Sequence, residues 1–228
     1  MLSLAVVLLI VSQTKQRTKP LEFRFRPCNG TTYEISLDVE WQDANRDSSL
    51  FMESKMVPTD ERRYTLTLNL VGARVNGQDA SKLLTDCLLE PGVTVDWNDL
   101  GQRAGGMSPL KTKQIPQSLM PLFREAGIYL CEFPRRAIQV GDTWRGTTTA
   151  SGGCTSGEYH LDGLGKVDGR PVAFVSVDNI ALFSGKLLVP IKFAVDLETG
   201  VPLTMTYQID DPSKGGRMAF TQTITLKP

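Results

Sequence analysis

Large apolar residues occupy every second position in two long runs near the end of this chain, residues 191–197 and 201–209. Polar or small residues fill the positions between them, and Glu198, Thr199 and Gly200 separate the two runs. Successive side chains of a β-strand point to opposite faces of a sheet, so each run predicts a strand with one buried and one solvated face. Together the two runs predict an antiparallel hairpin.

The same alternation recurs along most of the chain, at residues 33–41, 64–70, 93–97, 159–167, 170–177 and 218–226. Asn76-Gly77 and Asp168-Gly169 favour tight hairpin turns. At Gly72 the apolar positions change phase, which indicates a bulge of the kind that curves a sheet. We therefore expect a mainly β fold over residues 21–228, a single domain in which a curved antiparallel sheet forms a half-barrel or open barrel with two short helices.

Local turn chemistry predicts several strand boundaries. Residues 21–25 alternate in the same way and precede a turn, so we expect them to form a hairpin with residues 33–41. A weaker strand over residues 51–57 is expected to end at Pro58, because proline donates no hydrogen bond to a sheet. The stretch 98–113 is rich in glycine and polar residues and is expected to be a loop.

Two segments have helical spacing of their apolar residues. After Asp79, which can cap a helix, Leu83, Leu84, Cys87 and Leu88 share one helical face. The second candidate covers residues 115–129, within which Pro121 is expected to limit or kink the helix.

The charges balance, which argues against some classes of partner. Lys plus Arg and Asp plus Glu each number 25 in a chain of 228 residues. A chain without a positive excess has no electrostatic field to concentrate nucleic acid, so we expect no nucleic-acid partner. Membrane contact, if there is any, is expected to be peripheral.

The first twenty residues have the composition of an export signal. Residues 2–11 are almost entirely apolar, and a polar, basic stretch follows them up to Pro20. About ten apolar residues are too few to cross a bilayer as a helix but match the core of a signal peptide. We expect residues 1–20 to be a signal peptide or N-terminal anchor and the protein to be exported to the periplasm or cell envelope; a buried N-terminal strand is the alternative.

Four cysteines, Cys28, Cys87, Cys131 and Cys154, are spread widely along the chain. In an exported protein they would form one or two disulfides whose pairing the sequence does not define. Buried free thiols are the alternative, because cysteine is among the most buried residue types. Their spacing matches no zinc motif, so we expect no metal and no cofactor.

Candidate catalytic residues are few and scattered. The single histidine, His160, lies in the polar phase of a predicted strand, and no G-x-S-x-G motif accompanies it. A hydrolase built from carboxylates of separate strands would use Asp142, Asp162 and Asp196. We expect no catalytic site, and we retain this hydrolase as the alternative that remains.

The apolar phase of the strands carries large aromatic and aliphatic side chains that form either an ordinary core or the lining of a ligand cavity. The candidate ligand-lining residues are Tyr33, Trp41, Leu66, Trp97, Phe123, Trp144, Phe193 and Tyr207.

A basic cluster provides a candidate surface for lipid headgroups or a partner, with an ordinary solvated surface as the alternative. It comprises Lys111, Lys113, Arg124, Arg135 and Arg136.

One stretch carries a family resemblance. Phe133-Pro134 is followed by Val140-Gly141-Asp142-Thr143-Trp144, and further on come Tyr159-x-Leu161-x-Gly163 and Asp196-Leu197-Glu198-Thr199-Gly200. These segments resemble uncharacterised exported bacterial β-rich proteins, which are distantly similar to lipoprotein-carrier and lipid-binding envelope proteins. The resemblance implies a curved antiparallel sheet wrapped around helices, and it brings no catalytic residue with it.

The sequence thus predicts a non-enzymatic exported envelope protein that binds a hydrophobic or lipid-like ligand. A surface or interaction module with a solid core, docking on an envelope protein partner, is the alternative from a different class, and it predicts an exposed apolar patch or open strand edge.

Overall fold

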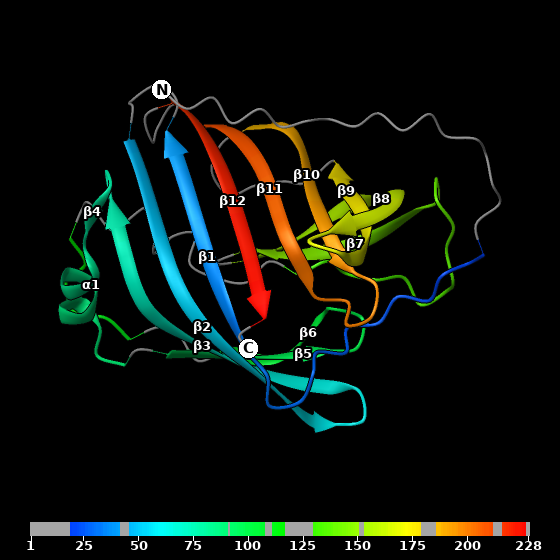
Figure 1. Cartoon of the computed structure of the whole chain (residues 1–228), viewed down its shortest axis with the longest axis horizontal. Coiled ribbons are helices and arrows are strands. Elements are labelled where there is room, and N and C mark those ends of the chain that lie inside the picture. The colour runs from blue at the N-terminus through cyan, green and yellow to red at the C-terminus, as the bar shows by residue number, and fades with distance from the viewer. Residues whose placement is uncertain are drawn as a thin grey trace.

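One strongly curved antiparallel sheet forms most of the molecule (Figure 1). The structure is a computed structural model, and it describes residues 19–41, 46–90, 92–107, 111–116, 130–150, 153–178, 186–211 and 216–226. Within these residues the strands follow the order β6-β5-β3-β2-β1-β12-β11-β10-β9-β8-β7, and β4 pairs with β3 beside this path. The mainly β fold class is therefore confirmed, and the curved sheet is not closed into a barrel.

The bounds of the elements, in chain order, are β1 Thr32–Trp41, β2 Arg46–Asp60, β3 Arg63–Val75, β4 Gln78–Asp79, α1 Ser81–Cys87, β5 Gly92–Asn98, β6 Arg103–Met107, β7 Thr143–Ala150, β8 Gly153–Val167, β9 Arg170–Asp178, β10 Lys186–Asp196, β11 Pro202–Asp211 and β12 Gly216–Leu226.

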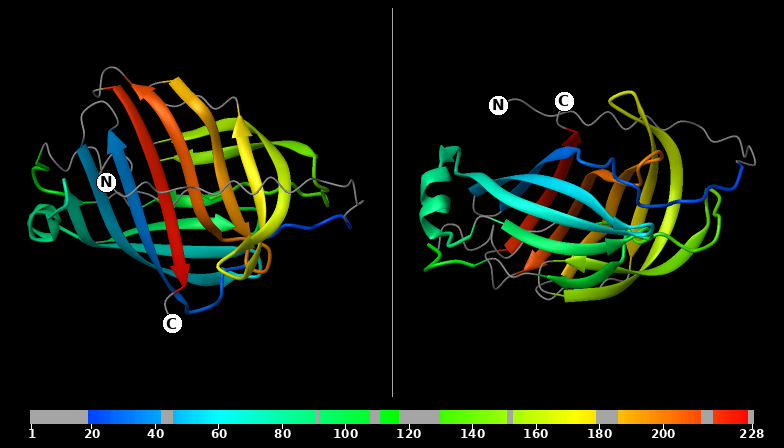
Figure 2. Two further views of the ribbon diagram at one scale, coloured as in Figure 1. Left: turned by 45° about the horizontal axis from the view of Figure 1, so that its top comes forward. Right: turned by 90° about the horizontal axis from the view of Figure 1, so that it is seen from below.

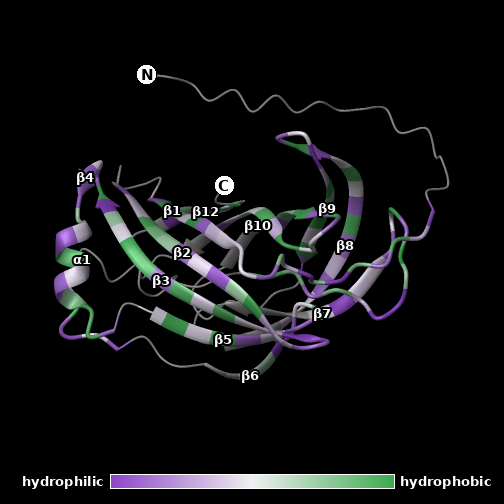
Figure 3. Cartoon of the chain, turned by 60° about the horizontal axis from the view of Figure 1, so that its bottom comes forward, coloured by the Kyte–Doolittle hydropathy of each residue, from purple (hydrophilic) through white to green (hydrophobic). Residues whose placement is uncertain are grey.

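Alternation along the strands decides which face of the sheet is buried. In β1 the side chains of Tyr33, Ile35, Leu37, Val39 and Trp41 are all buried, and the side chains between them are exposed or partly exposed. The same alternation appears as bands of opposite hydropathy along β2 and β3 in Figure 3. The buried side chains of both halves of the sheet belong to one apolar cluster, so the concave face is the core side.

Curvature brings the two ends of the sheet round to the same side of the molecule (Figure 2). The ladder between β2 and β3 shifts register where Phe51 and Met52 face Gly72 and Leu70, which is the bulge expected at Gly72. Further shifts occur between β8 and β9 and between β10 and β11. Bulges increase local twist and bend, so they let a single sheet fold over its own apolar face.

The segment 19–31 forms no hairpin with β1, and this corrects the expectation for residues 21–25. Both sides of β1 are already paired, one with β2 and the other with β12. Leu21 instead makes an isolated bridge with Ile138, and Phe23 and Phe25 are buried in the core cluster. Residues 21–25 do alternate, but they belong to a segment that covers one end of the half-barrel. We call this end the closed end.

A second segment, residues 130–133, joins the two ends of the sheet at this closed end. The Phe133 amide donates to the Leu100 carbonyl in the turn between β5 and β6, over 2.8 Å. On the other side, Trp144 of β7 donates its indole N–H to the Glu132 carbonyl, also over 2.8 Å. Gln102 donates to the Glu132 carboxylate as well. The segment therefore ties together the two ends of a sheet whose edge strands are β6 and β7.

Two further expectations are corrected. Strand β2 begins at Arg46, before the expected start at residue 51, and runs through Pro58 to Asp60, with a register shift absorbing the proline. The expected loop 98–113 contains strand β6.

One of the two expected helices is confirmed and the other lies outside the described residues. Helix α1 buries Leu84 and Cys87 against the sheet, but its N-cap is Ala80 rather than Asp79. Asp79 accepts a hydrogen bond from the Ser81 amide at 2.9 Å, so it supports the first turn from one residue further out. Of the second candidate, 115–129, only residues 115 and 116 are described, and they are not helical.

The cysteines whose side chains are described have free thiols. Cys28 is exposed, and Cys87 and Cys131 are buried. Burial raises the pKa of the Cys131 thiol well above its ordinary value, so this thiol stays protonated and unreactive at neutral pH. The side chain of Cys154 lies outside the described residues.

Within the described ranges, no helix is both long and apolar enough to span a membrane.

A glycine pair tests the contact that fastens the closed end. Gly169 and Gly200 both lie in hairpin turns with positive φ, +80° and +69°. A Cβ at Gly169 would meet open space, whereas one at Gly200 would overlap the backbone carbonyl of Arg24. Gly169→Ala should cost about 1 kcal/mol of unfolding free energy, the usual cost of a left-handed alanine. Gly200→Ala should cost about 2 kcal/mol more, because the segment 19–31 must shift.

Urea unfolding of both variants measures the difference. Equal losses would show that the segment 19–31 is not fastened to the turn between β10 and β11.

Candidate functional site

The structure places seven of the eight candidate ligand-lining residues in one apolar cluster on the concave face. Phe123, the eighth, lies outside the described residues. The seven, all at most 8% exposed, are Tyr33, Trp41, Leu66, Trp97, Trp144, Phe193 and Tyr207. They come from six different strands, with Tyr33 and Trp41 both on β1, so the sheet brings them together only through its curvature.

Stacked pairs of aromatic rings lie on this face, both between neighbouring strands and at the closed end. Tyr207 stacks on Phe220 with ring centroids 4.6 Å apart, and Trp144 stacks on Tyr159 at 5.4 Å. At the closed end, Phe23 stacks on Phe133 at 5.5 Å. Offset stacking of this kind adds to the stability gained from burying the rings.

A few polar atoms are embedded in the concave face. Ser54 and Gln222 are fully buried, and Ser48 is nearly so. Ser54 Oγ and Trp97 Nε1 have no hydrogen-bond partner in the part of the chain that the structure describes. Sequence reasoning singled out Trp97 for its bulk and passed over Ser54. The alternation does place Ser54 on the apolar phase of β2, between Met52 and Met56.

His160 and the three candidate carboxylates do not converge. His160 lies 3.5 Å from Asp178 on the outer face. Ser176, which faces His160 in the neighbouring strand, directs its hydroxyl to Asp162 at 3.0 Å. The serine is therefore committed to a carboxylate rather than to the imidazole, which is not the arrangement of a Ser-His-Asp triad.

Asp142 and Asp196 are occupied in turns. Asp142 accepts from the Gln139 amide and pairs with Arg136 at 3.2 Å. The amide hydrogen bond is the main reason that the pKa of Asp142 lies below its ordinary value. Asp142 therefore supports the turn that leads into β7.

Asp196 is 1% exposed and organises the turn between β10 and β11. Its Oδ1 accepts from the amides of Glu198 and Thr199 and from the Thr199 hydroxyl, at 2.8–3.0 Å. Its Oδ2 pairs with Arg170 at 2.8 Å. One oxygen of this carboxylate serves the turn and the other pairs with β9, so a substrate would have to displace those bonds to reach it.

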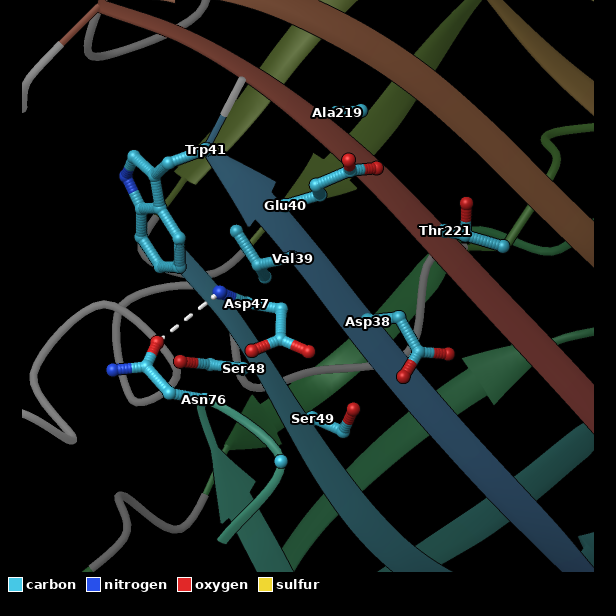
Figure 4. Close-up of a pocket in the computed structure, with 11 residues that line it drawn as sticks. Asp38, Val39, Glu40, Trp41, Asp47, Ser48, Ser49, Asn76, Ala219 and Thr221 are labelled. Atoms are coloured by element: carbon cyan, nitrogen blue, oxygen red, sulfur yellow. Dashed lines mark hydrogen bonds between the residues drawn. The ribbon is translucent and has the colours of Figure 1, made fainter. Parts of the chain in front are cut away.

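A groove of about 600 Å³ lies where β1 and β2 approach the end opposite the closed end (Figure 4). Asp38, Glu40 and Asp47 contribute carboxylates to it, and the Asp47 amide donates to Asn76 Oδ1 at 3.4 Å. In the described ranges, no group of three or more His, Cys, Asp or Glu side chains is arranged to hold a metal ion. The groove is therefore an acidic surface depression rather than a coordination site.

Comparison with known proteins gives no family. No family model and no curated protein matches the sequence. Among solved structures, this chain is similar to a lipovitellin structure that describes lipid–protein interactions, at 12% identity and a TM-score of 0.45, over 88% of this chain and 25% of that one. It is also similar to a DUF1329 family protein from Desulfovibrio piger, at 10% identity and a TM-score of 0.24, over 87% and 86% of the two chains. The chain thus spans a quarter of the lipovitellin chain's length.

Replacing Asp196 tests whether this carboxylate is structural. Asp196→Asn should lower the unfolding free energy by about 2–4 kcal/mol, because Arg170 loses its charged partner in a nearly buried turn. Asp162→Asn, on the exposed face, should change it by at most about 0.5 kcal/mol. Chemical denaturation of both variants provides the comparison, and an Asp196 variant as stable as the Asp162 variant would contradict the structural role.

Tyr33 should make the protein sensitive to alkali. Burial raises the pKa of Tyr33 to about 12, whereas the unfolded side chain titrates near its ordinary value of 10.0. The stabilisation is therefore fully present below pH 10 and is lost as pH rises towards 12, amounting to about 1 kcal/mol by pH 11. Tyr33→Phe should remove this part of the decline. Urea unfolding at pH 9, 10 and 11 measures it, and parallel declines in both proteins would refute the assignment.

Proposed function

We propose that the protein is a non-enzymatic, exported protein of the cell envelope that holds a hydrophobic or lipid-like ligand against the concave face of its sheet. The observation that carries the proposal is the pair of buried atoms Ser54 Oγ and Trp97 Nε1, which lack partners among the described residues. Buried polar atoms in a filled core are almost always hydrogen-bonded. A ligand that is mostly apolar but carries a polar group would supply such a partner.

The shape of the sheet supports this proposal. Sites for small hydrophobic ligands are concave and mostly apolar, with a small number of polar groups that orient the ligand. The concave face has this character, because the large residues of its apolar cluster surround a few buried polar side chains such as Ser54 and Gln222. Since Phe23, Phe25 and Phe133 fill the closed end, a ligand would enter from the opposite end or along an edge of the sheet.

The proposed location rests on the sequence. The apolar run 2–11 has the length of the apolar core of a signal peptide. An exported protein in the envelope would meet lipids and hydrophobic metabolites, which need a binding site that shields them from water.

Titration with cis-parinaric acid, a fluorescent fatty acid, tests the ligand site in protein stripped of lipid. We expect saturable binding that Ser54→Ala weakens by about fivefold, the effect of one hydrogen bond. The stability of this variant should not fall, because the hydroxyl has no partner to lose. Ser49→Ala, on the outer face of the same strand, is the matched control and should bind like the unaltered protein.

Ser54→Leu separates a ligand site from a solid core. If the concave face holds a ligand, the added bulk should exclude the probe and leave thermal unfolding nearly unchanged. If the face is filled, the variant should lose about 1–3 kcal/mol through overpacking. That loss, together with no probe binding by the unaltered protein, would overturn the proposal in favour of an interaction module with a solid core.

A further inference from the structure

A second pocket lies at the closed end and is lined mainly by arginines. Its volume is about 470 Å³, within the range of about 300–1,000 Å³ typical of ligand pockets. The lining residues are Arg24, Arg62, Arg63, Asn98, Asp99, Leu100 and Arg135. We call it the arginine pocket. Of the basic cluster expected from sequence, only Arg135 belongs to it.

Backbone hydrogen bonds that converge on Asp99 and Leu100 assemble this pocket from distant parts of the chain. The Asp99 amide donates to the Arg62 carbonyl at 3.0 Å, and the Asp99 carbonyl accepts from the Phe25 amide at 2.7 Å. The Leu100 carbonyl accepts from the Phe133 amide at 2.8 Å. Each bond fixes a segment that carries an arginine at or near the bonded residue, so the main chain places the arginines around one turn.

The turn at the centre of the pocket is itself rigid. Asn98 Oδ1 accepts from the amides of Leu100 and Gln102 at 3.0 and 2.9 Å, and its Nδ2 donates to Gln102 Oε1 at 2.9 Å. Asn98 is thus committed to the turn, and the arginines provide the donors that face an incoming group.

Two of the four guanidinium groups are uncommitted. The side chains of Arg62 and Arg135 are exposed and make no hydrogen bond or ion pair with any described residue. Arg24 is partly buried; it lies 3.7 Å from both Asp99 and Glu22 and donates to the Phe23 carbonyl at 2.7 Å. Arg63 lies 3.5 Å from Asp60 in an exposed pair, and exposed pairs contribute little to stability. An anion can therefore take the place of Asp60 beside Arg63 at small cost.

This concentration of charge is local. The lining holds four arginines and one aspartate, a sum of +3, in a chain whose net charge is zero. The planar guanidinium group donates two parallel hydrogen bonds to a phosphate or carboxylate oxygen pair. Several such forks around one pocket suit a tetrahedral dianion better than a planar carboxylate, because its oxygens point in several directions.

We propose that the arginine pocket binds a phosphate group, carried either by a soluble phosphate ester or by the headgroup of an anionic phospholipid. The site is on the outside of the closed end and does not depend on whether the concave face holds an apolar ligand.

Binding to two probes distinguishes the sources. Calorimetric titration with glycerol 3-phosphate reports a soluble ester, and co-sedimentation with vesicles of phosphatidylglycerol in phosphatidylcholine reports a headgroup. Either probe alone, or both, should bind the full chain. The double variant Arg62→Gln/Arg135→Gln should weaken that binding at least tenfold, because it removes the two uncommitted guanidinium groups.

The control is Arg145→Gln, which removes an exposed arginine on β7 outside the pocket and should bind like the unaltered protein. Arg62→Lys keeps the positive charge but loses the two parallel hydrogen bonds that a guanidinium group donates, so this variant should bind more weakly than the unaltered protein. Thermal unfolding checks that each variant is folded, and the single variants Arg62→Gln and Arg135→Gln replace the double one if it is not. Absence of binding to both probes, or an equal loss from Arg145→Gln, would overturn the proposal.

Discussion

A single sheet that is apolar on one face has to cover that face, and this constraint shapes the rest of the molecule. In the described residues there is no second sheet, and α1 is too short to cover the apolar face. The sheet therefore bends over its own apolar face, helped by bulges such as the one at Gly72, and irregular segments complete the cover. Burial of apolar surface is the dominant favourable term in folding, so curvature and cover follow from the same driving force.

The closed end shows how one junction serves two purposes. In the segment 19–31, Phe23 and Phe25 point into the core, while Arg24 between them lines the pocket on the outside. The pattern repeats after residue 130, where Phe133 is buried and Arg135 is exposed. The Asp99-Leu100 turn receives a backbone hydrogen bond from each of these segments. The same contacts that seal the apolar interior therefore also hold the arginines together on its outer side.

The acidic residues that a hydrolase would use have structural roles in this fold. Asp196 and Asp142 accept backbone amides in two turns of the closed end, and Asp162 accepts the Ser176 hydroxyl on the outer face. The motif segments that carried the family resemblance, around Asp142 and Asp196, are thus turn-forming sequences. In this fold both segments shape the backbone, and neither supplies a catalytic group.

The sequence by itself determined most of the strands, which of their faces is buried, and where the tight turns at Asn76-Gly77 and Asp168-Gly169 lie, because side-chain alternation and positive-φ turns are local properties of the chain. Only the tertiary structure decided which strands pair. Residues 21–25 alternate like a strand, yet β12 returns from the far end of the chain and occupies the side of β1 that a hairpin would have used. Sequence reasoning found neither the Ser54 Oγ, which lacks a partner among the described residues, nor the arginine pocket. Each depends on residues that are far apart along the chain and become neighbours only when the sheet curves.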